Sequence, residues 1–156
     1  MRSIRLLAAV VLATCLISSA QAEESYFDLE TCSICKNLGA HPELLSAMKW
    51  EIHEIENGML EIVTLPDEMK KTMDQCHAAM MKVVDKLKAG EPATLCQFCQ
   101  SYGGLEMSGA KTQEIKSAAG YITLVTSDNP EVVKKIHAHA KKTKTEYEKM
   151  LAATGK

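Results

Sequence analysis

The sequence contains few of the residues that mark non-globular chains, with 8 glycines, 4 prolines and only 4% aromatic residues among 156. Collagen-like and low-complexity chains are rich in glycine and proline, so both classes are excluded. An excess of charge of one sign is also absent, because 18 basic and 20 acidic side chains leave a net charge of −2. With 46% hydrophobic residues, the composition is that of an ordinary globular protein.

The only long apolar run lies at the N-terminus. Two arginines precede the apolar stretch 6–17, and small residues follow it up to Ala22. This pattern predicts a signal peptide over residues 1–22, and therefore a periplasmic or secreted protein. An alternative is a lipid anchor on Cys15.

The remaining chain lacks the features that several function classes require. Without the two leader arginines it has 16 basic and 20 acidic side chains, a net charge of −4, which makes nucleic acid a poor partner. No later apolar run approaches the roughly 18 residues that span a bilayer, so we expect no transmembrane segment. No Ser/His/Asp arrangement, phosphate-binding loop or pair of carboxylates stands out, and nothing in the sequence indicates an enzyme.

Two parts of the chain repeat the same order of motifs. A Cys-x-x-Cys motif at 32–35 recurs at 96–99. Each copy is followed by two extended runs around a glycine, Gly58 or Gly120, and then by a long amphipathic stretch. In the first copy the dipeptide between the two extended runs is Asn-Gly, which favours the left-handed backbone of a tight hairpin turn.

This order predicts an α+β fold built by internal duplication. Each unit has a short helix at its CxxC motif, a β-hairpin and a long helix. We expect the repeats at about 30–91 and 94–152, within a single domain covering 23–156. Alternating apolar residues in the extended runs indicate one antiparallel sheet with the helices packed on one face; they are Leu60, Ile62, Ile122 and Leu124.

The amphipathic stretches place a cysteine and a histidine at matching positions. Met69, Met73, Cys76 and further apolar residues recur at spacings of 3 and 4, which is the pattern of one helix face. Aligning the two stretches sets Cys76 opposite His139. The sequence therefore predicts equivalent roles for this thiol and this imidazole.

Five cysteines remain after removal of the signal peptide, and thiolate and imidazole groups occur in both repeats. Zinc and copper(I) both bind such groups, zinc in a tetrahedron. The motifs therefore predict an exported protein that binds zinc or copper(I). Its sites are either one four-cysteine site between the repeats or two sites that add Cys76 or His139 to a CxxC pair. The candidate ligands are Cys32, Cys35, Cys76, Cys96, Cys99, His139, His137 and His77.

The order of knuckle, hairpin and helix resembles the treble-clef arrangement of small heavy-metal modules, including the YHS and TRASH types. The resemblance covers Cys32 to about Cys76 and Cys96 to about His139. It implies a metal held between the knuckle and the helix. Such modules place their helix ligands in the first turn, whereas Cys76 and His139 lie roughly three turns in.

Two other functions remain open at this point. In an exported protein the CxxC pairs can form disulfides, which would make the chain a non-catalytic binding or structural domain. The same pairs occur in thiol–disulfide oxidoreductases, although those place their CxxC after a strand. Haem attachment is excluded, because Lys36 and Gln100 stand where it needs histidine. An exposed Cys76 would also permit a homodimer.

Overall fold

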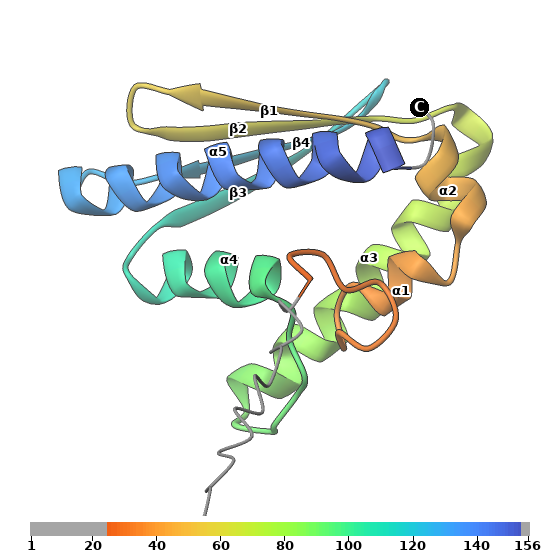
Figure 1. Cartoon of the computed structure of the whole chain (residues 1–156), viewed down its shortest axis with the longest axis horizontal. Coiled ribbons are helices and arrows are strands. Elements are labelled where there is room, and N and C mark those ends of the chain that lie inside the picture. Colours follow the sequence, from red (N-terminus) through yellow and green to blue (C-terminus); the bar gives the residue numbers. More distant parts are fainter. Residues whose placement is uncertain (1–24, 154–156) are drawn as a thin grey trace, which may run out of the picture.

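A computed structural model describes residues 25–153, so the expected signal peptide and the Cys15 anchor lie outside the described part of the chain. Figure 1 shows the elements in chain order. They are α1 Lys36–Gly39, α2 Pro42–Ala47, β1 Lys49–Ile55, β2 Gly58–Thr64, α3 Asp67–Lys88, α4 Gln97–Met107, β3 Lys111–Ser117, β4 Gly120–Thr126 and α5 Pro130–Ala153.

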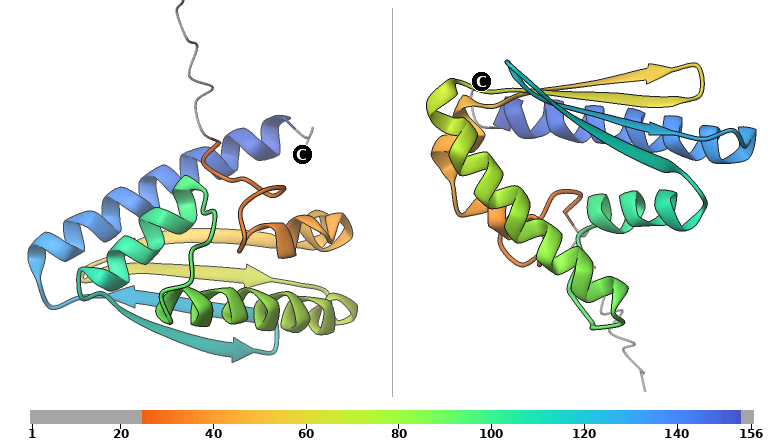
Figure 2. Two further views of the ribbon diagram at one scale, coloured as in Figure 1. Left: turned by 90° about the horizontal axis from the view of Figure 1, so that it is seen from below. Right: turned by 180° about the vertical axis from the view of Figure 1, so that it is seen from behind.

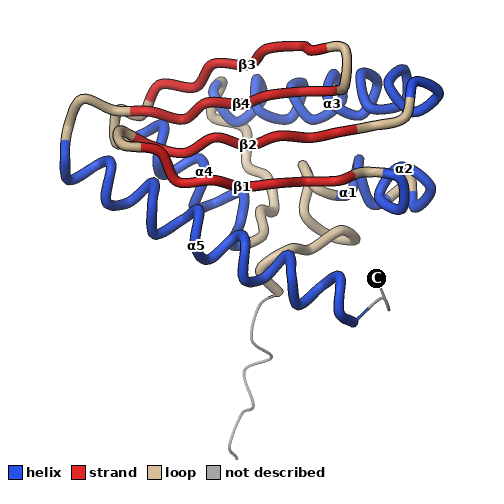
Figure 3. The backbone as a smooth tube through the Cα atoms, turned by 90° about the horizontal axis from the view of Figure 1, so that it is seen from above, coloured by secondary structure: helices blue, strands red, loops and turns tan. Residues whose placement is uncertain are grey.

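The four strands form one sheet in the order β1-β2-β4-β3, and every neighbouring pair is antiparallel (Figure 3). Two hairpins, β1–β2 and β3–β4, meet along the central strands β2 and β4, where Gly58 lies opposite Thr126 and Gly120 opposite Thr64. The predicted α+β class with an antiparallel sheet is confirmed.

The helices lie on one side of this sheet in Figures 1 and 2. Helix α5 packs against β1, β2 and β4. Met59 and Val125 lie directly opposite each other on the covered face and contact Ile136 of α5 in the main core cluster. Burial of these apolar side chains, at roughly 25 cal/mol per Å², anchors α5 to the sheet.

The alternating apolar residues of the two central strands lie on the other face. Leu60 neighbours Met59 in the strand, and Leu124 neighbours Val125, so both side chains point away from the helices. Ile62 and Ile122 share their face. Strand β2 has apolar side chains on both of its faces, so alternation alone could not show which set faces the core.

The glycines that begin β2 and β4 are required by close contact between the strands. A Cβ on Gly58 would lie 1.9 Å from the carbonyl oxygen of Val125, and one on Gly120 would lie 2.0 Å from that of Val63. The left-handed Asn-Gly turn expected from the sequence is wrong. Glu56 and Asn57 connect the strands, and no described residue other than glycine has a positive φ.

Polar contacts join helix α3 to the β3–β4 hairpin. Asp74 accepts hydrogen bonds from Lys116 and Tyr121, each at 2.6 Å. On its other side, α3 packs on the short N-terminal helices through Leu44 and Cys76. Among the described residues, no helix is both long enough and apolar enough to cross a membrane.

Candidate metal centre

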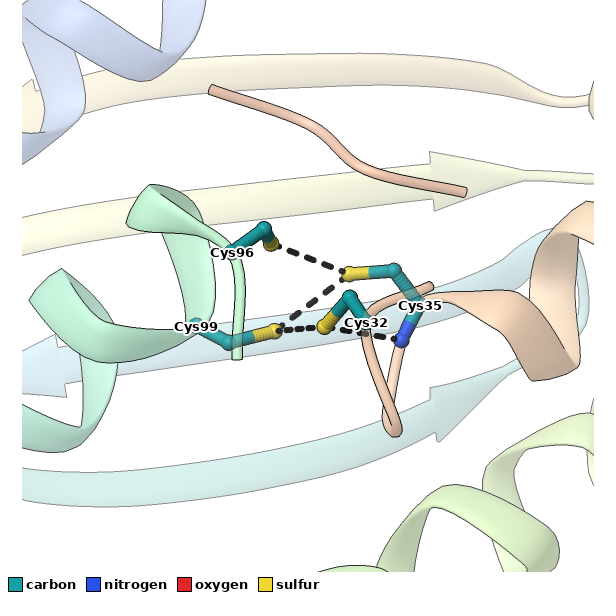
Figure 4. A group of neighbouring side chains, drawn as sticks. All are labelled: Cys32, Cys35, Cys96 and Cys99. Atoms are coloured by element: carbon teal, nitrogen blue, oxygen red, sulfur yellow. Dashed lines mark hydrogen bonds between the residues drawn. The ribbon is translucent and has the colours of Figure 1, made fainter. Parts of the chain in front are cut away.

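Four cysteine side chains from distant parts of the chain meet in one place (Figure 4). The sulfur atoms of Cys32, Cys35, Cys96 and Cys99 all lie within 4.8 Å of one another. Sγ of Cys35 lies 3.3 Å from that of Cys99 and 3.7 Å from that of Cys96, and Sγ of Cys32 lies 3.7 Å from that of Cys99. The two CxxC motifs therefore converge on a single point.

Each motif stands where a loop turns into a helix. Cys35 is the N-cap residue of α1, and Cys96 is the N-cap residue of α4. Cys99 lies in the first turn of α4. A two-residue spacer spans about one helical turn, so both sulfurs of a motif can face the same side. The positive end of the α4 dipole also favours thiolates at Cys96 and Cys99.

Backbone hydrogen bonds hold the N-terminal segment against α4 and the loop before it. The amide of Ser33 donates to the carbonyl oxygen of Thr94 at 2.8 Å, and the amide of Phe98 donates to that of Tyr26 at 3.0 Å. The Asp28 carboxylate accepts hydrogen bonds from the Thr31 hydroxyl and from backbone amides, including that of Thr31 at 2.7 Å. These bonds order the turn that leads into Cys32.

The cysteine cluster is closed to solvent. Cys32 is fully buried, and the other three side chains are at most 8% exposed. The residues packed around the cluster are apolar: Leu29, Ile34, Leu95 and Phe98. An ion held here would be screened from water, and its attraction to the sulfurs would be strong in this low-dielectric environment.

Hydrogen bonds shift the pKa values of the cluster cysteines in opposite directions. Bonds from the thiols of Cys35 and Cys99, and from the backbone amides of Asp28 and Cys99, hold the pKa of Cys96 well below its ordinary value. Hydrogen bonds with neighbouring cysteines and burial raise the pKa values of Cys35 and Cys99. A bound cation would stabilise the thiolate forms of these cysteines.

The sulfur positions suit a tetrahedral thiolate site. Zinc–sulfur bonds of about 2.3 Å place the four sulfurs of a regular tetrahedron about 3.8 Å apart. Two of the three short separations between the motifs are 3.7 Å, and small side-chain rotations would bring the others to this value. The geometry fits a single ion bound by four cysteines.

Cys76 lies in a different cluster. Its thiol donates to the backbone oxygen of Asn37 at 3.4 Å, and it packs with Leu44 and Leu65 between α3 and the short N-terminal helices. Burial raises the pKa of the Cys76 thiol. In these surroundings Cys76 acts as a small apolar core residue.

His139 lies beside α4, on the other side of Phe98. Its Nδ1 atom is 2.8 Å from the Ser101 hydroxyl, and its ring packs against Phe98 and Tyr102 at centroid distances of 5.4 and 5.7 Å. The side chain is only 4% exposed, and burial lowers its pKa to about 4. Among the described residues Nε2 has no hydrogen-bond partner.

The other two candidate histidines contact the sheet. His137 is 2.9 Å from the carbonyl oxygen of Ile55 through Nε2, and His77 pairs with Glu114 at 3.2 Å. In the described part of the chain, the one group of potential ligands close enough to share an ion consists of the four CxxC cysteines. The assignment of Cys76 and of these histidines as ligands stays a prediction from the sequence.

Four residues that support the site or the core were not identified from the sequence. Asp28 supports Cys96 through its amide, and the hydroxyl of Tyr26 contacts that of Thr143 at 2.6 Å. The Asp-Leu-Glu-Thr stretch at 28–31 is a recognisable turn signal. Glu61 is buried on the covered face of the sheet, and no alternation pattern would place a carboxylate there.

Comparison of the chain with protein-family models, with curated proteins and with solved structures finds no match. The functional argument therefore rests on the geometry of the site.

Proposed function

We propose that this chain is an exported protein that binds one zinc ion through Cys32, Cys35, Cys96 and Cys99. The observation that carries the proposal is the approach of four buried sulfurs to within 4.8 Å of one another. Four thiols packed in an apolar shell are typical of a site that gains its full stability from a cation.

Zinc fits this donor set better than copper(I). Tetrahedral sites with four sulfurs are typical of zinc or iron, whereas copper(I) favours two or three thiolates. The four sulfurs come from two rigid helix starts, which supports a fixed tetrahedron. Copper(I) remains the second candidate for the ion.

The ion in this proposal has a structural role. Four protein ligands fill a tetrahedral zinc ion and leave no position for water or substrate. Catalytic thiols must be reached by their substrates, and all four sulfurs are buried. Burial thus favours a bound ion over a thiol–disulfide oxidoreductase. The ion would join the N-terminal loop to α4, in addition to the backbone hydrogen bond from Phe98 to Tyr26.

We further propose that the protein arose by duplication of one hairpin–helix unit and that each copy supplies one CxxC motif. Three observations support this. The strand order β1-β2-β4-β3 is symmetric about its centre. Gly58 and Gly120 make matching close approaches to Val125 and Val63. Each hairpin is followed by a helix of 22 or 24 residues. Export rests on the signal-peptide pattern of residues 1–22.

Elemental analysis tests the function directly. The chain is purified without oxygen, and zinc, copper and iron are measured against protein concentration. We expect one zinc per chain. Less than about a tenth of an equivalent of every transition metal, with no uptake on reconstitution, would contradict the proposal. One equivalent of copper or iron would retain the four-cysteine site but assign it to another ion.

A further inference from the structure

The short distances in the cysteine cluster run between the two motifs. Three sulfur–sulfur hydrogen bonds connect the motifs: Cys35 to Cys99 at 3.3 Å, Cys35 to Cys96 at 3.7 Å and Cys32 to Cys99 at 3.7 Å. Within the first motif the Cys35 amide donates to Sγ of Cys32 at 3.5 Å, and within the second motif the side chains of Cys96 and Cys99 share a hydrogen bond. The fold therefore presents each thiol to a thiol of the other motif.

This arrangement differs from that of a redox-active CxxC pair, in which the two cysteines of one motif react with each other. A bond between Cys35 and Cys99 would link positions that are 64 apart in the sequence, whereas a bond within a motif closes a loop of only a few residues. Disulfides that close longer loops restrict the unfolded chain more and stabilise the folded chain more. Proximity and loop length favour the same pairing.

We infer that oxidation of the metal-free chain forms a disulfide between the motifs, first between Cys35 and Cys99, and that this bond replaces the ion as the link between the N-terminal loop and α4. The role of the ion in this exchange rests on the proposed function. The disulfide pairing itself rests only on the sulfur positions.

The oxidant in this reaction is a low-molecular-weight disulfide such as oxidised glutathione. In the metal-free chain, where we expect the N-terminal loop to loosen from α4, the buried sulfurs become accessible, and a cysteine thiolate attacks one sulfur of the small disulfide. This step releases one small thiol and leaves a mixed disulfide. The second cysteine then attacks the protein sulfur and releases the other small thiol. The protein loses two electrons and two protons, and the small disulfide becomes two thiols. If zinc is bound, loss of two thiolates releases it.

A peptide map tests the pairing. The chain is stripped of metal with EDTA, treated with oxidised glutathione, blocked with N-ethylmaleimide and digested with trypsin without reduction. Cleavage at Lys36, Lys88 and Lys111 leaves each CxxC motif in its own peptide. We expect the two peptides to be joined by a disulfide. Two separate peptides, each with an internal disulfide, would overturn the inference.

Two double variants test which cysteines react first. Cys32→Ser with Cys96→Ser keeps Cys35 and Cys99, whose sulfurs lie 3.3 Å apart. Cys35→Ser with Cys99→Ser keeps Cys32 and Cys96, whose sulfurs lie within 4.8 Å of each other. We expect the first variant to form its disulfide several times faster. Equal rates, or a faster second variant, would overturn the assignment of Cys35 and Cys99.

The same experiment separates this inference from the proposed function. In a parallel sample the chain is loaded with zinc before oxidised glutathione is added, and we expect zinc to slow the joining of the peptides. Joined peptides without protection by zinc would leave the pairing intact and contradict the role of the ion. Cys76, buried in another cluster, should stay unpaired in both samples and serves as the internal control.

Discussion

The sulfur atoms of Cys35 and Cys99 lie 3.3 Å apart, although the two residues are 64 positions apart in the chain. Neither motif forms a complete site alone, because each supplies two of the four sulfurs. The site exists only when the N-terminal loop is packed on α4. Metal binding and this packing should therefore stabilise each other.

Replacement of Cys99 by alanine should remove the ion, whereas replacement of Cys76 by alanine should not. Cys99 lies in the four-sulfur group, and Cys76 packs with Leu44 in another cluster. We expect Cys99→Ala to contain well under one zinc per chain and to lose about 3 kcal/mol of stability, the effect of a ligand at about 100 times its Kd. Cys76→Ala should keep its zinc and lose about 1 kcal/mol. Zinc content and urea unfolding measure both. Loss of zinc from Cys76→Ala would restore Cys76 as a ligand.

Removal of the ion should loosen the N-terminal loop and leave the sheet unchanged. The amides of Ser33 and Phe98 bridge the loop and α4, and they should exchange on the order of 100-fold faster in EDTA. The amide of Leu65, which donates to Ala119 at 3.0 Å, is the control. Hydrogen exchange followed by mass spectrometry gives both rates. Equal acceleration of all three amides would indicate global unfolding instead.

Acid should destabilise the fold through His139. Burial lowers its pKa to about 4 from the ordinary value of 6.5, so the unfolded chain binds more protons between these values. Stability is unaffected above about pH 6.5 and falls as pH decreases, by about 3 kcal/mol at pH 4. In His139→Asn this loss should be absent. The free energy of unfolding of both chains is measured in urea from pH 4 to 8. Parallel curves would contradict the burial of a neutral imidazole.

Glu61 should act in the opposite direction. Burial raises its pKa to about 7 from the ordinary value of 4.5, so the folded chain binds more protons in that range. The contribution of protonated Glu61 to the free energy of unfolding is fully present below about pH 4.5. It is lost as pH rises through 7, with a cost of about 3 kcal/mol. Glu61→Gln cannot ionise, and we expect its stability relative to the unmodified chain to increase with pH over this interval. A difference independent of pH would show that Glu61 has a partner for its charge.

Local sequence signals were sufficient to predict the two hairpins and the two long helices. The two hairpins and the long helices follow from alternation, glycine positions and spacings of 3 and 4, all of which act between neighbouring residues. Val132, Ile136, His139 and Tyr147 are buried on α5 as their spacing predicts. The face of the sheet that is covered was harder to assign, because the neighbours Met59 and Leu60 are both apolar and only the position of α5 selects between them.

Sequence by itself determined that two CxxC pairs would each present their sulfurs together, because the spacing of one pair spans a single helical turn. It also placed Cys76 and His139 on buried helix faces. Only the tertiary structure decided which of these groups meet. The distance from Cys35 to Cys99 depends on how the N-terminal loop packs on α4, through contacts such as Ser33 with Thr94. Contacts between residues so far apart arise from the packing of whole elements, and no local pattern encodes them.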